Sequence, residues 1–288
     1  MPTILEETRF IMKKYNIRAN KNLGQNFLIN EEVVKNIVGC SNIEKEDLVI
    51  EIGPGLGTLT SKLLENANKV IAVEIDNKMV EVISDRFRMY NNLQIINEDI
   101  LKIDLNAIIE NEKQEDGKVK IVANLPYYIS TPIIMKLLEE RLNIDEIVVM
   151  VQKEVADRLA AKPGTKLSGA ITYAVDYYSE AEPVLNVGRD CFIPAPKVDS
   201  EVIKLKLRKQ PKVEISNEKE LFKLIKLNFT QRRKTLINVL VNSGVVKNKE
   251  IAMKIFDELE FDYGVRGETL NLEQYKLLID CINKYSQY

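Results

Sequence analysis

Hydrophobic residues follow two different patterns along this chain of 288 residues. Over residues 4–15 they recur at helical spacing, and Asn30 stands where the N-cap of a second helix, ending near residue 38, is expected. From residue 48 the pattern changes to short, almost continuous apolar runs separated by helical stretches. The runs predict strands at 48–52, 70–75, 93–96, 119–123 and 147–151, with helices between them, for example at 58–66 and 78–87.

This alternation predicts an α/β fold. Apolar strands that alternate with helices indicate a mostly parallel sheet with both faces covered. Two later β-rich stretches, 181–187 and 200–207, are expected to add antiparallel edge strands. Beyond them the strands stop, and helices are expected at 217–241, 249–259 and 272–285. We therefore place a domain boundary near Gln210, with an α/β domain over 1–210 and a smaller helical domain over 211–288.

Composition narrows the possible chemistry. The chain is 45% hydrophobic and 29% charged, as in an ordinary globular protein, and no apolar run approaches a membrane span. No secretory signal is visible, and three widely spaced cysteines make a disulfide framework unexpected, so we expect a cytoplasmic protein. The sequence has no histidine, which excludes a histidine general base and a histidine-ligated metal; we expect no metal.

Charge is unevenly spread although the net charge is only −2. Residues 206–288 carry 16 basic and 11 acidic side chains, whereas the rest of the chain has an acidic excess. Residues 8–30 form a basic N-terminal extension with five basic residues and no acidic one. Two basic ends suggest a polyanionic partner, and an unevenly charged solvated surface is the alternative.

Polar residues and glycines follow four successive predicted strands. Gly53 and Gly55 begin a turn with the spacing G-x-G-x-G after the first strand, and Glu74, Asp99 and Asn124 follow the next three. Parallel strands bring their carboxyl ends to one edge, so these residues are expected to border one crevice. Thr58 breaks the dinucleotide fingerprint, which favours a different nucleoside-like ligand. A turn needed only for packing, and polar residues that serve only as helix caps, are the alternatives.

The tetrapeptide Asn124-Leu125-Pro126-Tyr127 is the most specific motif. An exocyclic amine on an aromatic base is a poor nucleophile, and a site that methylates it should place acceptors at its two N–H groups. The Asn124 side-chain oxygen and the Leu125 carbonyl fit that role, while Tyr127 is suited to stack on the base. This chemistry needs no strong base, in keeping with a chain that lacks histidine. A simple Asn-Pro turn beside a core tyrosine is the alternative.

With these motifs the chain resembles the S-adenosylmethionine-dependent ribosomal RNA adenine N6-dimethyltransferases of the KsgA type. The resemblance covers nearly the whole sequence. The matching stretches are residues 24–28, 51–60, 74, 99, 124–127, 151–159, 163–166, 192–200 and 228–236.

The resemblance implies a Rossmann-like class I methyltransferase sheet with a smaller C-terminal helical domain that binds RNA or the ribosome. It implies dimethylation, with S-adenosylmethionine, of two adjacent adenosines in the 3′-terminal hairpin loop of small-subunit rRNA. The partner is then the assembling small ribosomal subunit, and we expect a monomer. The residues implied for cofactor binding are Gln25, Asn26, Leu28, Gly53, Gly55, Glu74, Asp99, Ile100 and Asn124; for catalysis Asn124, Leu125 and Tyr127; and for RNA binding Tyr127, Phe192, Arg232, Arg233 and Lys234.

Four other functions are weighed against this one. A sister enzyme of large-subunit rRNA usually has isoleucine in place of Leu125 and a shorter C-terminal domain. A DNA adenine methyltransferase would need a separate target-recognition region, and Thr58 disfavours a nicotinamide oxidoreductase. A non-catalytic assembly factor is disfavoured because the motif residues are intact. The basic triplet 232–234 has its own alternative, the solvated face of a helix.

Overall fold

The computed structural model describes residues 2–20, 23–215 and 217–286 and divides the chain into two compact units. The first unit runs to Ala156 and resumes over Glu180–Leu207. The second unit takes Asp157–Ser179 and the described residues beyond Leu207. The boundary expected near Gln210 lies close to this last crossing, but the sequence did not indicate that residues 157–179 group with the C-terminal helices.

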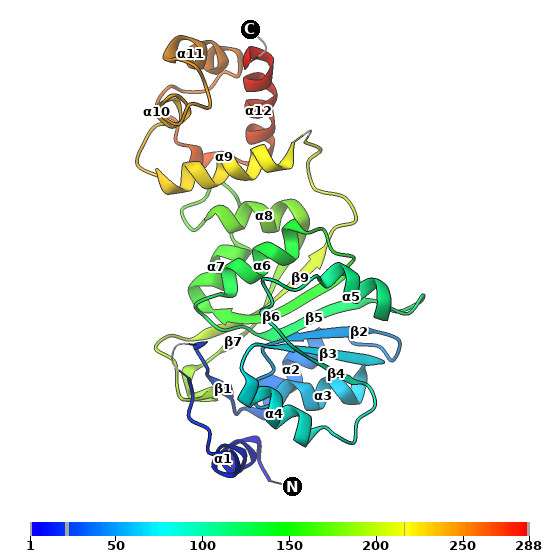
Figure 1. Cartoon of the computed structure of the whole chain (residues 1–288). Coiled ribbons are helices and arrows are strands. Elements are labelled where there is room, and N and C mark those ends of the chain that lie inside the picture. Colours follow the sequence, from blue (N-terminus) through cyan, green and yellow to red (C-terminus); the bar gives the residue numbers. More distant parts are fainter. Residues whose placement is uncertain (1, 21–22, 216, 287–288) are drawn as a thin grey trace. The chain divides into compact units, whose positions relative to one another are not determined.

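A seven-stranded sheet in the order β4-β3-β2-β5-β6-β9-β7 forms the centre of the first unit (Figure 1). Five neighbouring strands are parallel, and β9 pairs antiparallel with β6. The α/β fold is therefore confirmed. β9 was expected at an edge but lies inside the sheet, because β7 pairs on its far side. The strands are β2 (Leu48–Ile52), β3 (Lys69–Glu74), β4 (Leu93–Asn97), β5 (Val119–Asn124), β6 (Glu146–Gln152), β7 (Ser179–Val187) and β9 (Ser200–Leu207).

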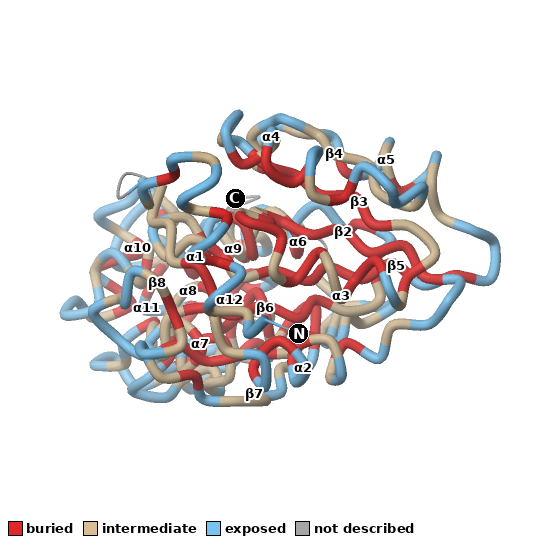
Figure 2. The backbone as a smooth tube through the Cα atoms, turned by 90° about the horizontal axis from the view of Figure 1, so that it is seen from below, coloured by how far each residue is buried: buried red, intermediate tan, exposed pale blue. Residues whose placement is uncertain are grey.

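Helices cover both faces of this sheet. A core cluster joins side chains of α2, α3 and α4 to strand residues such as Val49, Val70 and Val122, while Figure 1 shows α5 and α6 in front of the strands. β2 is buried along its whole length, and Figure 2 shows the central strands as a buried layer. The helices of this unit are α1 (Ile4–Lys14), α2 (Glu31–Cys40), α3 (Thr58–Asn66), α4 (Asn77–Arg86), α5 (Leu105–Glu112) and α6 (Ser130–Glu139); α7 (Lys153–Ala160) crosses the unit boundary.

Two short strands that the sequence did not predict join segments far apart in the chain. β1 (Phe27–Leu28) pairs antiparallel with β8 (Phe192–Ile193), which follows the 3-10 turn η2 (Arg189–Cys191). Leu28 and Phe192 face each other in this ladder, and both belong to the main core cluster. The described residues 23–30 are therefore attached to the rest of the first unit by this pairing.

The second unit consists of helices. The expected single helix over 217–241 is wrong, because α9 ends at Thr230 and a turn carries the chain to α10. Leu236 at the start of α10 donates its backbone N–H to the Val265 carbonyl, a tertiary contact invisible in local periodicity. The elements are α8 (Ala170–Tyr178), α9 (Glu218–Thr230), α10 (Leu236–Asn242), α11 (Lys249–Glu258), η3 (Gly267–Thr269) and α12 (Leu272–Ser286).

Residues 157–179 join this unit through buried polar contacts as well as packing. The Tyr173 hydroxyl donates to the Leu270 carbonyl at 2.6 Å, and the Tyr173 ring packs edge-on against Phe229 and Tyr275.

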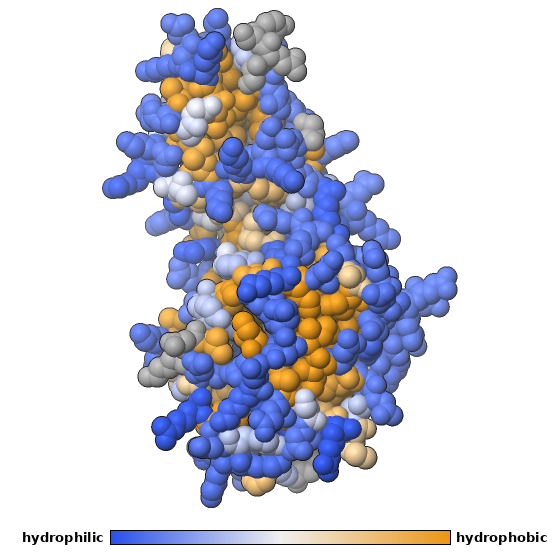
Figure 3. Space-filling model, viewed as in Figure 1, coloured by the Kyte–Doolittle hydropathy of each residue, from blue (hydrophilic) through white to orange (hydrophobic). Residues whose placement is uncertain are grey.

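Seen from outside, apolar side chains gather on one face of the first unit, in the region where Figure 1 shows α5 and α6 (Figure 3). None of the helices described spans the length of apolar sequence that a lipid bilayer requires.

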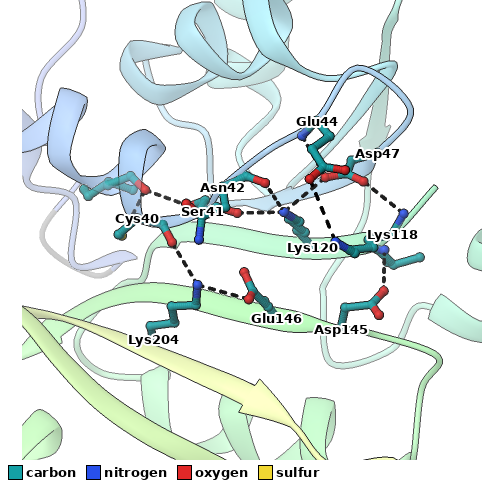
Figure 4. A network of polar contacts seen from close by, with 12 residues as sticks. Cys40, Ser41, Asn42, Glu44, Asp47, Lys118, Lys120, Asp145, Glu146 and Lys204 are labelled. Atoms are coloured by element: carbon teal, nitrogen blue, oxygen red, sulfur yellow. Dashed lines mark hydrogen bonds and ion pairs between the residues drawn. The ribbon is translucent and has the colours of Figure 1, made fainter.

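A buried ion pair fixes the amino-terminal edge of the sheet (Figure 4). Lys120 of β5 and Asp47 before β2 lie 3.1 Å apart, and each side chain is only 2% exposed. The Lys120 ammonium also donates to the carbonyls of Ser41 and Asn42. Burial opposes ionisation of Asp47, but the N–H groups of Glu44 and Lys118 and the ammonium of Lys120 outweigh it, so the Asp47 pKa is lowered. The pair ties the end of α2 to two central strands.

Replacing Lys120 by methionine should destabilise the protein strongly. The substitution keeps most of the side-chain volume but leaves the Asp47 carboxylate buried without its cation, which typically costs about 3–5 kcal/mol. Urea denaturation measures the free energy of unfolding. The control is Lys118→Met, because Lys118 is 52% exposed and its ion pair with Glu44 spans 4.0 Å, so a change of about 0.5 kcal/mol or less is expected. Equal losses in the two variants would contradict the structural role of the buried pair.

Candidate functional site

A pocket opens at the carboxyl edge of the sheet and encloses about 1030 Å³ of space, its open mouth included. The residues that follow the parallel strands line it together, as their spacing predicted. Every residue predicted for cofactor binding or catalysis belongs to this lining, namely Gln25, Asn26, Leu28, Gly53, Gly55, Glu74, Asp99, Ile100, Asn124, Leu125 and Tyr127.

The residues predicted for RNA binding do not all lie at the pocket. Tyr127 lines the pocket, but Phe192 is only 3% exposed and lies in the main core cluster. Arg232, Arg233 and Lys234 occupy the turn between α9 and α10 in the second unit, so the helix face considered as their alternative does not exist.

The glycine turn after β2 combines a packing role with a binding role. Gly57 has a φ of 82°, and a Cβ there would come within 2.5 Å of the Phe87 ring, so its absent side chain serves helix packing. Gly55 has a φ of 56° and lines the pocket, and its N–H donates to the Glu74 carboxylate at 3.2 Å. The packing alternative therefore explains Gly57 and leaves Gly55 as part of the pocket wall.

Glu74 presents a nearly buried carboxylate at the end of β3. It accepts hydrogen bonds from the N–H groups of Gly55 and Asp76, at 3.2 Å and 2.9 Å, and is 7% exposed. Burial raises the pKa of this carboxyl above its ordinary value, despite both hydrogen bonds. Each carboxylate oxygen keeps a lone pair for a further donor, so the group suits the two neighbouring hydroxyls of a ribose.

Asp99 lines the pocket from the loop after β4, the strand next to β3. One of its carboxylate oxygens accepts from the Leu101 N–H at 3.0 Å, and the side chain is 22% exposed. Ile100 beside it is buried, while Ile75 after β3 is 51% exposed; both line the pocket. Two aliphatic side chains with an adjacent carboxylate provide apolar surface and one acceptor, which is what an adenine ring with an amino group needs.

The Asn124 amide has a defined orientation. Its nitrogen donates to the backbone carbonyl of Asn26 at 3.2 Å. A carbonyl oxygen only accepts, so the amide nitrogen must face it and the side-chain oxygen must point elsewhere. That oxygen is thereby available as an acceptor. Leu125 behind it is anchored to β6, since its N–H donates to the Met150 carbonyl at 3.1 Å.

The N-terminal segment forms one wall of the pocket. The Gln25 side chain donates to Asp76 at 2.8 Å and accepts from the Asn20 N–H at 2.9 Å. The Asn26 side chain donates to the Gly24 carbonyl at 3.0 Å, and Leu28 is buried in the core. The segment thus reaches both the end of β3 and the Asn124 loop, so it links the two sides of the pocket.

Two polar residues of the site were given no role of their own by the sequence analysis. Ser200, buried at the start of β9, has its hydroxyl oxygen 2.5 Å from that of Tyr127. Glu51 in β2 is 1% exposed and accepts a hydrogen bond from the Thr60 hydroxyl at 2.6 Å. A serine in a strand gives no sequence pattern that would indicate a functional role. An acidic residue within an apolar strand gives a weak indication, because a carboxylate is rarely buried in a strand.

Burial raises the pKa of Glu51 to about 8, with a smaller contribution in the same direction from the charge of Glu74 and against the lowering effect of the hydrogen bond from Thr60. The described residues contain no group of three or more potential metal ligands. The pocket therefore offers acceptors, apolar surface and backbone N–H groups, but no metal centre built from the residues described. Such a pocket is suited to hold a nucleoside-bearing cofactor beside a base whose amine is the reacting group.

The buried Glu51 should make stability depend on pH. Because its folded pKa lies above the ordinary value of 4.5, the unfolded chain ionises first, and stability falls as pH rises from about 4.5 to about 8. Glu51→Gln removes this titration. We expect the variant to gain about 3–5 kcal/mol relative to the parent between pH 5 and pH 8.5, at about 1.4 kcal/mol per pKa unit.

Urea denaturation across that pH range measures the difference. Glu65→Gln is the control, because Glu65 on the same helix as Thr60 is 49% exposed and should leave the pH dependence of the parent unchanged. Parallel stability curves for the parent and Glu51→Gln would show that Glu51 is ionised throughout.

Comparisons with known proteins identify the family of the chain. A model of the ribosomal RNA adenine dimethylase family matches residues 16–277. Proteins named ribosomal RNA small subunit methyltransferase A are 45% identical over 272 residues in Alkaliphilus metalliredigens, with 94% of each chain covered, and 48% identical over 281 residues in Lachnoclostridium phytofermentans, with 97% of each covered.

Solved structures give the same result. A dimethyladenosine transferase from Plasmodium falciparum superposes with a TM-score of 0.75 at 29% identity, covering 90% of this chain and 98% of its own. The 23S rRNA methyltransferase ErmE superposes with a TM-score of 0.65 at 23% identity, which supports the class I methyltransferase fold alone. From the family match over most of its length and the identity to these relatives, the chain belongs to the ribosomal RNA adenine dimethylase family.

Proposed function

We propose that this methyltransferase dimethylates N6 of two adjacent adenosines in the 3′-terminal hairpin loop of 16S-type small-subunit rRNA, with S-adenosylmethionine as the methyl donor. The observation that carries the proposal is the oriented Asn124 amide beside Tyr127, in a pocket that also contains Glu74 and Asp99. The choice of the small subunit is supported by the names of the relatives that share 45–48% identity over nearly the whole chain.

The pocket residues fit S-adenosylmethionine by their chemistry. Glu74 has free lone pairs for the ribose hydroxyls, Asp99 with Ile100 suits the adenine, and the backbone at Gly53 and Gly55 suits the methionine end. Gln25, Asn26 and Leu28 close this side of the pocket. When bound, the cofactor supplies a methyl group activated by a sulfonium charge.

Asn124 and Leu125 act on the target amine. The Asn124 side-chain oxygen accepts from one N–H of the N6 amine, and the Leu125 carbonyl is assigned to the other. These contacts draw electron density towards the nitrogen and hold its lone pair along the line of attack, so positioning and electrostatics carry the catalysis. The proton is lost after the nitrogen becomes positively charged, and no strong base is required.

Tyr127 stacks on the target base once the base has left its own stack. The ring already lines the pocket. A stacking role for Phe192 requires its ring to leave the core cluster in which it is 3% exposed. The stacking contact that the described geometry favours is therefore the one with Tyr127.

The helical region over 211–288 binds rRNA phosphates and positions the particle, and the basic N-terminal extension assists. Arg233 and Lys234 are exposed on their turn, whereas Arg232 forms an ion pair with Glu268 and lies over the Phe229 ring. Arg232 therefore supports the turn, and the other two side chains are free to reach phosphate. We further propose that the protein works as a monomer in the cytoplasm, on small subunits that are still assembling, without a metal.

Methyl transfer from labelled S-adenosylmethionine tests the proposal directly. The substrates are small-subunit particles purified from cells that lack this protein, large-subunit rRNA and duplex DNA. We expect label only in the small-subunit RNA, and mass spectrometry should find N6-dimethyladenosine at two adjacent positions of the 3′ hairpin. Label in large-subunit rRNA would assign the sister activity, and no label in any substrate would support a non-catalytic assembly factor.

Two substitutions in the pocket should separate catalysis from cofactor binding. Asn124→Ala should lower single-turnover methylation by ~10²-fold or more while cofactor affinity stays within about tenfold, since a preorganised polar contact acts in the transition state. Glu74→Ala should instead weaken cofactor binding by about 1.5–3 kcal/mol, and saturating cofactor should restore much of the rate. Calorimetry gives the affinities. Parental turnover in Asn124→Ala would remove that residue from catalysis.

The double variant Arg233→Ala/Lys234→Ala should weaken binding to the small-subunit particle. Removing one cation that binds a phosphate of single-stranded RNA lowers the log–log salt slope by ~0.7, so the slope should fall by about 1.4. Thermal stability and cofactor affinity should stay at parental values, because both side chains are exposed. The control is Lys35→Ala/Lys62→Ala, which removes the same charge from paired lysines of the first unit. An unchanged slope in the first variant would assign both side chains to solvent.

A further inference from the structure

Ser200 is a fully buried polar residue whose hydroxyl contacts a pocket residue. It has no exposed surface, and its hydroxyl oxygen lies 2.5 Å from the hydroxyl oxygen of Tyr127. Within the described part of the chain, the structure records this as the only hydrogen bond of the Ser200 side chain. A buried hydroxyl is rarely left without a partner, so the two groups depend on each other.

The backbone on the Ser200 side of this contact is rigid. Ser200 begins β9 and pairs with Gln152 in the first position of a continuous antiparallel ladder with β6. The preceding residue, Asp199, is held twice: its carbonyl accepts from the Lys153 N–H at 3.0 Å, and its carboxylate accepts from the Arg189 N–H at 3.1 Å. The Ser200 hydroxyl therefore has a fixed position relative to the sheet.

Tyr127 is more adaptable by itself. It follows Pro126 on the loop after β5, and burial raises the pKa of its phenol, so the hydroxyl lies in a poorly hydrated place. The first side-chain torsion of a tyrosine sets where the axis of its ring points, and a hydrogen bond at the far end of that axis restrains this torsion. Its neighbour Tyr128 illustrates the contrast, because that side chain is 56% exposed at the pocket.

We propose that Ser200 is a positioning residue for methyl transfer, which holds the Tyr127 phenol and so keeps the axis of the ring in place at the pocket, where the ring can stack on the target base beside Asn124. This inference rests on the proposed function. Asn124 is oriented by the Asn26 carbonyl and Tyr127 by the Ser200 hydroxyl, so two residues of the tetrapeptide are held by segments distant in sequence. Ser200 itself needs no contact with the substrate or the cofactor.

Three variants test the hydrogen bond from both ends. Ser200→Ala removes one hydroxyl, Tyr127→Phe removes the other and keeps the ring, and the double variant removes both. Single-turnover methylation of small-subunit particles at saturating cofactor should fall about three- to tenfold in each single variant, the effect of one neutral hydrogen bond. The double variant should be no slower than the slower single variant, because the same hydrogen bond is absent from all three.

Two further measurements and a matched control separate positioning from a purely structural role. Cofactor affinity should remain within about twofold of the parent. A hairpin with 2-aminopurine at the target position should show weaker stacking quench with Ser200→Ala, since the ring is no longer held. The matched control is Ser41→Ala, which removes another fully buried serine hydroxyl, one that donates to the Ile37 carbonyl at 2.7 Å, and should retain the parental rate and quench.

The possible results are distinguishable. If the parent enzyme does not methylate the particle, the proposed function fails. If the parent is active and Ser200→Ala retains its rate and quench, or if the two single effects multiply in the double variant, the positioning role is overturned while the function stands. Tyr127→Phe gives the same test should Ser200→Ala not fold.

Discussion

Parallel pairing of β2 with β3 and β5 is the constraint on which the rest of the first unit depends. Because these strands run in the same direction, Gly53, Glu74 and Asn124 emerge at one edge of the sheet. The opposite edge is fastened by the buried pair of Lys120 and Asp47, which ties the end of α2 to the strands. One edge is therefore stabilised by a closed polar network, and the other is left open as a pocket.

The pocket is held together by contacts between segments far apart in sequence. The N-terminal segment reaches Asp76 through Gln25 and orients Asn124 through the Asn26 carbonyl. It also pairs through β1 with β8, which lies shortly before Ser200 in the chain. The N-terminal segment closes the cofactor side of the pocket, and the segment that contains β8 and Ser200 fixes the base side. The pairing of β1 with β8 connects these two segments. This connection explains how a site built on loops can keep the defined geometry that methyl transfer requires.

Two buried carboxyl groups show what the pocket costs in stability. Glu51 and Glu74 lie on neighbouring strands, and burial raises the pKa of both. The described structure gives them hydroxyl and N–H donors and no cation. Apolar residues there would stabilise the sheet more, but they would not offer acceptors to a polar ligand. The strongest departure from ordinary core composition therefore coincides with the binding site.

The sequence by itself determined the alternating α/β order, the strands 48–52 and 200–207, and the meeting of Gly53, Glu74, Asp99 and Asn124 at one pocket. These follow from local periodicity and from the rule that parallel strands end at one edge, which needs no knowledge of packing. The tertiary structure alone decided the pairing of Phe27–Leu28 with Phe192–Ile193, the break after Thr230 and the grouping of 157–179 with the C-terminal helices.

For individual residues, too, some properties follow from the residue type and others from the tertiary structure. The type of residue at Tyr127 already suggested stacking, whereas the burial of Phe192 and the partnership of Ser200 depend on long-range packing. An aromatic ring is compatible with a core or a binding face, and a serine with almost any position. Short-range patterns record the periodicity of an element, but the neighbour that satisfies a buried hydroxyl is chosen by how distant strands come together.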